Sequence, residues 1–373
     1  MKIGSLFSGV AGLDRAVESF FDAEVAWFVE FDAAPSKVLA HHYPGVPNYG
    51  DVTTVDWANV EPIDILTGGF PCQDVSLAGA RRGLRDGTRS GLWSEYAKAI
   101  DILRPKLVVI ENVRGLLSAQ TIEEVDASDS ELEPGTGGMG EPTWGDRPVL
   151  NAFGRVLGDL AELGYDAEWV GLRAADAGAP HNRYRVFIVA QDANLPTGDQ
   201  WWQSASRQAE SGRTRAGAGG RSGAPAQAGN GNVSNSTPWW AADDTAPTHA
   251  SRIGGNESYC PPRLGGEGAD RASVADEHSS RPGGTEWGIY QPAITRWEDT
   301  IGRVAPPATN PDGRDGSHRL SAEFVTWMMG WPQGWVTDPA IGLTRNEQLK
   351  ACGNGVVTQQ AYLALSVLMG RAA

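Results

Sequence analysis

Short apolar runs alternate with longer amphipathic stretches through the first 190 residues, and this alternation is the strongest constraint on the fold. Each apolar run has the length of a buried strand, and each amphipathic stretch has the spacing of a helix that packs on a sheet. We expect strands at 2–7, 25–30, 63–67, 107–111, 166–172 and 185–190. We expect helices at 12–22, 34–42, 91–103 and 149–163. The pattern predicts a doubly wound α/β fold.

The character of the sequence changes after the last expected strand. From 193 to 318 Gly, Ala, Ser, Arg and Asn dominate, and apolar periodicity nearly vanishes. Low complexity within 204–235 predicts flexibility there. Regular structure is expected again from Arg319, where Ser321 predicts the N-cap of a helix. The residues after Gly355 predict a final apolar helix.

This change predicts three regions along the chain. They are a first domain at 1–192, a smaller and irregular domain at 193–330, and a C-terminal segment at 331–373 that returns to the first domain. Within the first domain, 118–148 holds eight carboxylates against one cation, Arg147, and is rich in Gly, Ser and Pro. We expect this stretch to be a solvated loop insertion.

The net charge of −15 argues by itself against a nucleic-acid partner. The local charge differs, because the stretch 78–93 carries four arginines against the single acid Asp86. These arginines are Arg81, Arg82, Arg85 and Arg89. We expect this basic loop to contact phosphates.

A single cysteine, Cys72, lies in the turn Gly68-Gly69-Phe70-Pro71-Cys72-Gln73, directly after an expected strand. A lone cysteine is usually a small buried hydrophobic residue. The turn, the preceding proline and the basic loop that follows favour instead a reactive thiol, whose pKa nearby cations would lower. Open α/β sheets place their chemistry at such strand ends.

Two further motifs place charged side chains beside expected strands. Glu111 follows the apolar run 107–110, and Arg183 and Arg185 stand where the strand at 185–190 begins. Taken alone, Glu111 is also what a solvated strand end would carry, and the two arginines could form an ordinary surface charge pair. A site between Glu111 and Cys72 is expected because both follow strands of one sheet.

The first expected strand opens into a glycine-containing turn that runs from Phe7 to Asp14. Such a turn lets a ligand approach the backbone and a helix N-terminus, although many are purely structural. Glu30 ends the second strand with a carboxylate that suits a ribose diol. Asp51 then offers an acid for an adenine amine. Together these features predict a site for a nucleotide-like cofactor.

In this order the motifs resemble those of the DNA (cytosine-5) methyltransferases of the prokaryotic or phage type. Two C-terminal stretches, Leu320 to Pro332 and Gly353 to Gln360, resemble later segments of the same family. One departure is Ala11-Gly12, where the family has paired glycines. Another is His181, where many members have glutamine; both side chains can donate a hydrogen bond.

The resemblance implies a Rossmann-like domain that binds S-adenosylmethionine and a smaller target-recognition domain. The implied cofactor-binding residues are Phe7, Gly9, Gly12, Leu13, Glu30, Asp51, Pro71 and Asn354. In the implied active site, Cys72 is the nucleophile and Glu111 contacts N3 and the exocyclic amine of cytosine. Arg185 contacts O2 of the base, and Arg183 supports the site.

The chemistry of the reaction explains why a thiol is needed. Carbon-5 of cytosine is a poor nucleophile, and addition of a thiolate at carbon-6 makes it enamine-like and able to attack a methyl sulfonium. A target inside duplex DNA must be flipped out, and the loop 78–93 is the candidate to close over it. The Arg and Asn content of 193–330 suits phosphate and base-edge contacts, whereas 204–235 could equally be a linker.

The lengths of the apolar runs and the spacing of cysteine and histidine bear on membrane and metal binding. No apolar run approaches the length of a membrane span, and the N-terminus shows no cleavable signal. The three cysteines and six histidines show no ligand spacing, so no metal is expected. We expect a monomeric cytoplasmic protein with double-stranded DNA as partner. A cognate endonuclease of a restriction-modification system is not required as a stable partner.

Three alternatives stay open. The same fold and chemistry could act on tRNA, although the long region between the arginine motif and the C-terminal segment favours DNA. The chain could be a catalytically silent DNA-binding relative, against which stand Cys72, Glu111 and Arg185. A cysteine hydrolase would need a histidine base near Cys72, and no recognisable pattern supplies one.

Overall fold

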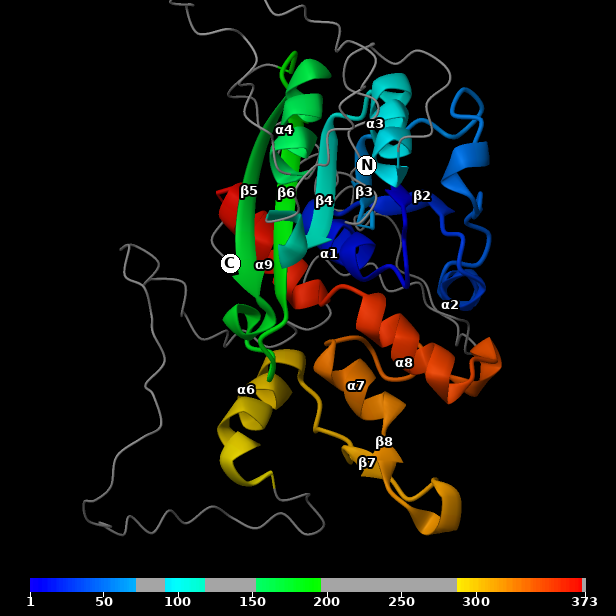
Figure 1. Ribbon diagram of the computed structural model, residues 1–373, viewed down its shortest axis with the longest axis vertical. Coiled ribbons are helices and arrows are strands. Elements are labelled where there is room, and N and C mark those ends of the chain that lie inside the picture. The colour runs from blue at the N-terminus through cyan, green and yellow to red at the C-terminus, as the bar shows by residue number, and fades with distance from the viewer. Residues whose placement is uncertain (72–90, 118–151, 196–286, 371–373) are drawn as a thin grey trace, which may run out of the picture.

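The computed structural model describes residues 1–71, 91–117, 152–195 and 287–370 (Figure 1). In these residues a six-stranded sheet has the order β2-β1-β3-β4-β6-β5. Its strands are β1 Lys2–Leu6, β2 Glu24–Val29, β3 Ile65–Gly68, β4 Leu107–Val113, β5 Tyr165–Arg173 and β6 Tyr184–Asp192. Strand β6 runs antiparallel to β4 and β5, whereas β2, β1, β3 and β4 are parallel to one another. The six expected strands are therefore confirmed, with ends shifted by at most two residues.

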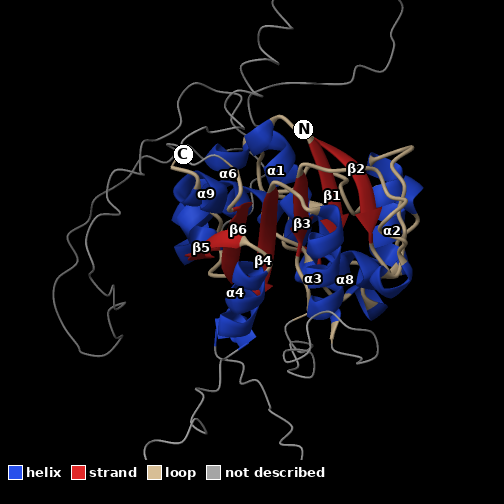
Figure 2. Ribbon diagram, turned by 90° about the horizontal axis from the view of Figure 1, so that it is seen from above, coloured by secondary structure: helices blue, strands red, loops and turns tan. Residues whose placement is uncertain are grey.

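Helices cover both faces of this sheet (Figure 2). Helices α1 Gly12–Phe21 and α9 Thr358–Leu368 pack on one face, and α3 Leu92–Leu103 and α4 Ala152–Glu162 pack on the other. Along β4, Leu107 and Val109 point into the core under α1 and α9, whereas Val108 and Ile110 point into the core under α3 and α4. A strand buried on both faces is apolar throughout, which explains the unbroken run. The doubly wound α/β fold is confirmed.

The helices expected in the first 192 residues are also present. The stretches 12–22, 34–42 and 91–103 form α1, α2 Ala33–His42 and α3, and the described part of 149–163 forms α4. In α1, α3 and α4 the buried residues recur at helical spacing, as in Val156 and Leu160 of α4, whereas α2 buries only the adjacent Val38 and Leu39. Along the described ranges, no helix is long and apolar enough to cross a membrane.

The C-terminal part differs from the expectation in two places. Helix α6 Gln291–Ile301 lies where no regular structure was expected, although Ile294, Trp297 and Ile301 form a buried helical stripe. Gly302 ends this helix in the left-handed conformation. Helix α8 Arg345–Asn354 was also missed, because it buries only Ala351 and Cys352 and its sequence signal is a capping box. The expected helix behind Ser321 is α7 Ala322–Met328, and the Ser321 side chain accepts from Phe324 N as a cap should.

Four tryptophans build a third core at one end of the sheet, where α6, α7 and α8 lie (Figure 1). Trp297 and Trp327 donate their indole N–H groups to the carbonyls of Trp327 and Arg303, at 2.9 and 3.0 Å. Trp335 donates to the carbonyl of Val10 at 2.9 Å, and Trp331 donates to the carbonyl of Val356, which follows α8, at 3.0 Å. Because each of these four indoles has a partner, their rings bury large apolar areas without an unpaired donor. This core includes Val10, so it joins the C-terminal helices to the turn after β1.

Two acidic side chains one helical turn apart lie on the inner side of α1. Asp14 is buried and accepts a hydrogen bond from the Thr67 hydroxyl, and burial raises its pKa to about 6. Glu18 accepts from the Tyr43 hydroxyl at 2.9 Å, and burial raises its pKa to about 7. In the folded protein both carboxyl groups therefore hold their protons at a pH where the unfolded chain has lost them.

Replacing Glu18 by Gln should flatten the pH dependence of stability. A carboxyl group whose pKa is raised on folding stabilises the protein below its unfolded pKa, and this contribution is lost as pH rises through the folded value near 7. The wild type should therefore lose stability between about pH 4.5 and 7, whereas E18Q should be more stable at pH 8 by about 1–3 kcal/mol. Urea unfolding from pH 5 to 8 measures this difference. Glu162→Gln, on the exposed surface of α4, is the control; parallel curves for wild type and E18Q would contradict the prediction.

Candidate active site

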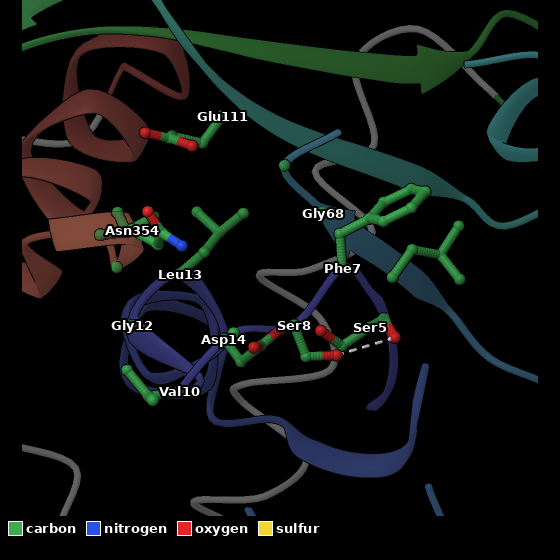
Figure 3. A pocket seen from close by; sticks show the side chains of 15 residues that line it. Ser5, Phe7, Ser8, Val10, Gly12, Leu13, Asp14, Gly68, Glu111 and Asn354 are labelled. Atoms are coloured by element: carbon green, nitrogen blue, oxygen red, sulfur yellow. Dashed lines mark hydrogen bonds between the residues drawn. The ribbon is translucent and has the colours of Figure 1, made fainter. Parts of the chain in front are cut away.

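A pocket opens at the carboxyl ends of β1, β3 and β4, next to the end of α8 (Figure 3). Carboxyl ends of parallel strands are where open α/β sheets bind ligands. The lining comes from the end of β1 and the turn after it, two glycines at the end of β3, one acid on β4, and the last residue of α8 with the segment that follows. The residues are Ser5, Leu6, Phe7, Ser8, Gly9, Val10, Gly12, Leu13, Asp14, Gly68, Gly69, Glu111, Asn354, Gly355 and Val356. Thus segments from both ends of the chain form one pocket.

The turn after β1 has an unusual backbone. Phe7, Gly9 and Ala11 all have positive φ, at 51°, 54° and 63°. Ala11, which stands where the resemblance implies a glycine, is the N-cap of α1 and adopts the left-handed conformation that glycine accepts more readily. The turn therefore keeps this shape with alanine, at a strain of about 1 kcal/mol.

Gly12 packs backbone against backbone on the segment after α8. A β-carbon at this position would stand 2.4 Å from the carbonyl oxygen of Val356. The Thr358 hydroxyl also donates to the carbonyl of Gly12 at 3.1 Å. Gly12 is therefore required by the close approach of these two segments rather than by its φ.

Glu30 braces the same turn from the end of β2. Its Oε2 accepts a hydrogen bond from Gly9 N at 2.7 Å, and its Oε1 accepts from Asp32 N at 2.8 Å. Burial raises the pKa of Glu30. Phe31 follows directly and is 76% exposed, so it presents an aromatic face beside this carboxylate. Sequence reasoning did not single out Phe31, although its place directly after the acid is a usable signal.

Asp51 lies in the next turn, which is tied to Glu30 by Asn48. Asn48 Oδ1 accepts from Glu30 N at 2.9 Å and from Gly50 N at 3.1 Å. The Asp51 carboxylate accepts from Thr53 N at 2.9 Å, and these bonds lower its pKa. Of the eight residues implied for the cofactor, Glu30, Asp51 and Pro71 lie outside the pocket lining, whereas the other five belong to it.

A buried ion pair joins β4 to β6 at the edge of the pocket. Arg185 Nε lies 2.6 Å from Glu111 Oε1, and the two side chains are only 13% and 10% exposed. Glu111 pairs with Phe187, and Arg185 pairs with Val113, so the ion pair is diagonal across two antiparallel strands. Burial raises the pKa of Glu111, against the opposing effect of the Arg185 cation. The structure thus brings together two of the residues that the sequence predicted for one site.

Two neighbours of Arg185 hold other parts of the structure. Arg183 donates to the carbonyls of Gly353 and Gly355, at 2.7 and 2.8 Å. His181 Nε2 lies 3.1 Å from the carbonyl of Met328, at the end of α7. Because a carbonyl only accepts, His181 donates here, as the comparison with glutamine predicted. The arginine motif therefore contacts both α7 and the segment after α8.

The chain that leads to Cys72 passes along Glu111. A β-carbon on Gly69 would stand 3.0 Å from Glu111 Oε2. The Asn112 side chain donates to the carbonyl of Phe70 at 2.9 Å, and the Phe70 ring packs against Trp93. Cys72 itself lies outside the described residues, as do the four arginines at 81–89 and the stretches 118–148 and 204–235. No cluster of three or more His, Cys, Asp or Glu side chains that could hold a metal occurs in the described part.

Comparisons with known proteins agree with these motifs. A family model described as C-5 cytosine-specific DNA methylase matches residues 1–133 and 146–365. The Type II methyltransferase M.NgoBV of Neisseria gonorrhoeae is 30% identical over 201 residues, 52% of this chain and 42% of that protein. A DNA N-6-adenine-methyltransferase of Escherichia phage P1 is 33% identical over 215 residues, 50% of this chain and 28% of that protein. The family match confirms the resemblance that the motifs predicted.

The chain thus spans less than half the length of these curated relatives. Among solved structures, the Dnmt2 methyltransferase of S. pombe is similar with a TM-score of 0.49 and 12% identity, over 99% of this chain and 98% of that one.

Replacing Gly12 by Ala should open the contact between the two ends of the chain. The added methyl group would stand 2.4 Å from the Val356 carbonyl, so one segment must move, and we expect a loss of about 1–3 kcal/mol in unfolding free energy. Gly158→Ala is the matched control, since a β-carbon there meets no atom within 4 Å, and alanine in a helix should stabilise by about 0.5–1 kcal/mol. Chemical denaturation measures both; equal stability of G12A and wild type would contradict the prediction.

Proposed function

Because the chain belongs to the C-5 cytosine-specific DNA methylase family, we propose that it transfers a methyl group from S-adenosylmethionine to carbon-5 of a cytosine in a specific duplex DNA sequence. The observation that carries this proposal is the buried Glu111–Arg185 ion pair at the edge of the pocket. A carboxyl group and a guanidinium held side by side offer donors and an acceptor to one edge of a pyrimidine. The glycine-lined pocket beside them opens at the same edge of the sheet.

The residues of the pocket fit S-adenosylmethionine. Gly9 lets a ligand come close to the backbone of the turn, and the Glu30 carboxylate, which braces that turn from the end of β2, is proposed to bind a ribose diol. Phe31 offers an exposed ring face for adenine, and Asp51 an acid for its amine. When bound, the cofactor supplies an electrophilic methyl group on a sulfonium. The protein's task is to hold that methyl group facing carbon-5 and to exclude water.

On the cytosine side, Glu111 and Arg185 hold the base while Cys72 reacts. The Cys72 thiolate forms a bond to carbon-6 and makes carbon-5 nucleophilic; bound S-adenosylmethionine would supply the methyl group to carbon-5, with cleavage of its sulfur–methyl bond, and would leave as S-adenosylhomocysteine. A base removes the proton from carbon-5, and the carbon–sulfur bond breaks to release Cys72. Burial raises the pKa of Glu111, which eases protonation of this carboxylate when the base is bound; the protonated carboxyl group can then donate to N3 and make carbon-6 more electrophilic. Arg185 donates to O2 of the base, and Arg183 supports the site.

Duplex DNA is the proposed partner, and the target base is flipped into the site. The smaller domain at 193–330 is proposed to read the sequence in the major groove, and the arginines at 81–89 to contact phosphates. These segments lie wholly or in large part outside the described residues. We propose that the protein acts as a monomer in the cytoplasm, without a metal.

Adenine in DNA and cytosine in tRNA are two other possible substrates, and the position of the transferred methyl group distinguishes them. The relative from phage P1 carries the name of an N-6-adenine methyltransferase, and the same fold could also act on tRNA. Attack by an exocyclic amine needs no thiol, whereas attack by carbon-5 of a pyrimidine does. The sequence Gly-Phe-Pro-Cys-Gln at 69–73 therefore favours carbon-5.

Methyl transfer to unmethylated duplex DNA tests the proposal. We expect radiolabelled methyl from S-adenosylmethionine to appear at carbon-5 of one cytosine in a short repeated site, located by bisulfite sequencing. Cys72→Ser should abolish transfer and the covalent complex with 5-fluorocytosine DNA while cofactor binding persists. A Cys72→Ser protein that still methylates would overturn the mechanism. If the label appears in N6-methyladenine, or only in tRNA, the proposed substrate is wrong, and adenine in DNA or tRNA takes its place.

Replacing Glu111 by Gln tests the role of the buried acid. The amide keeps the shape of the carboxyl group but cannot give up a proton, so we expect methyl transfer to fall by about 10²–10⁴-fold. Wild-type transfer should decline as pH rises through the raised pKa of Glu111, because the protonated form is lost. Single-turnover rates measured across pH for both proteins test this, with cofactor affinity as the control. An E111Q enzyme with the wild-type rate would exclude Glu111 as a proton donor.

A further inference from the structure

The guanidinium of Arg183 holds two backbone carbonyls that flank a single pocket residue. Its Nη1 donates to Gly353 O at 2.7 Å, and its Nη2 donates to Gly355 O at 2.8 Å. Asn354 lies between these two glycines and lines the pocket, and its side chain extends from the end of α8 toward it (Figure 3). Arg183 therefore binds the carbonyls of the residues before and after Asn354.

The position of Asn354 depends on its backbone. Within the described ranges, the structure gives the Asn354 side chain no hydrogen bond that would orient it. On the far side the segment is held by the close contact of Val356 with Gly12 and by the bond from the Trp331 indole to the Val356 carbonyl, at 3.0 Å. At the end of α8, the hydrogen bonds from Arg183 to the Gly353 and Gly355 carbonyls fix the same segment.

Arginine suits this position for two reasons. The last carbonyls of a helix have no partner within the helix, and α8 ends at Asn354. The planar fork of arginine can donate to two carbonyls at once, and its positive charge faces the negative end of the helix dipole. Burial and the nearby Arg185 cation lower the pKa of Arg183 to about 10, which leaves it charged at neutral pH.

Arg183 and Arg185 are thus directed at different parts of the site. Arg185 lies against Glu111, on the side proposed for the cytosine. Arg183 contacts the segment after α8, and its own backbone is held by Gln360, whose side chain donates to the Arg183 carbonyl at 3.1 Å. Two arginines of one motif therefore reach the two halves of the site.

We propose that Arg183 is a positioning residue for the cofactor and acts by holding the Asn354 amide in the pocket. This inference rests on the proposed function, in that the pocket is taken to bind S-adenosylmethionine. The amide of Asn354 offers a donor and an acceptor to a polar group of the cofactor. Loss of the Arg183 grip releases the segment and lowers cofactor affinity without any contact between Arg183 and the cofactor.

Cofactor affinity in the absence of DNA tests the inference. Calorimetric titration with S-adenosylhomocysteine, the unreactive product, compares wild type, R183Q, N354A and the double variant. We expect R183Q and N354A each to weaken binding about tenfold, which is the effect of one lost hydrogen bond to a charged or well-placed group. The double variant should bind no more weakly than the weaker single variant, because both changes remove one interaction.

Two further variants keep the test decisive. Arg345→Gln is the matched control: Arg345 also donates to a backbone carbonyl, that of Leu320, but lies outside the pocket lining, so affinity should not change. If R183Q fails to fold, R183K keeps the charge but not the fork, and a several-fold loss is expected. Wild-type affinity in R183Q, or in R183K where R183Q cannot be measured, or losses that multiply in the double variant, would overturn the inference. A wild type that binds no cofactor would overturn the proposed function as well.

Discussion

The contact between the turn after β1 and the segment after α8 is the constraint on which the site depends. Gly12 and Val356 meet backbone to backbone with no space for a β-carbon, and the Trp335 indole adds a bond to Val10. Because these residues come from opposite ends of the chain, the pocket exists only once both have packed. The third core, which holds α6, α7 and α8 around tryptophans, keeps the C-terminal segment in place. The contacts that stabilise the fold therefore also set the shape of the pocket.

The structure also buries several ionisable side chains. Glu111 and Arg185 form an ion pair with little access to water, and removing one partner would leave an uncompensated charge. Asp14 and Glu18 lie nearby on α1 with pKa values raised by burial. Such groups lower stability at neutral pH compared with apolar residues of the same size. Asp14 and Glu111 line the pocket, and buried acids with raised pKa values are typical of functional sites.

Much of the fold followed from the sequence, because strand and helix periods are local signals. The run 107–110 predicted β4, and the same reasoning placed Glu111 at its carboxyl end; in the structure the strand continues two residues further, to Val113. Helices α6 and α8 were missed for opposite reasons. In α6 the buried stripe is present but is surrounded by a polar, glycine-rich sequence, whereas α8 has almost no apolar stripe at all. The predicted roles of Cys72 and of the basic loop stay predictions, since those residues lie outside the described ones.

The sequence by itself determined the class of fold, the order of the motifs and the family to which the chain belongs. Each of these depends on residue types at short spacing, which a single chain displays directly. The tertiary structure alone decided which partner each charged side chain takes. Glu30 braces Gly9, and Arg183 grips carbonyls about 170 positions later in the chain. No periodicity encodes such pairs, because they form only when distant elements pack together. Each donor then binds the carbonyl that packing has brought within reach and left without another partner.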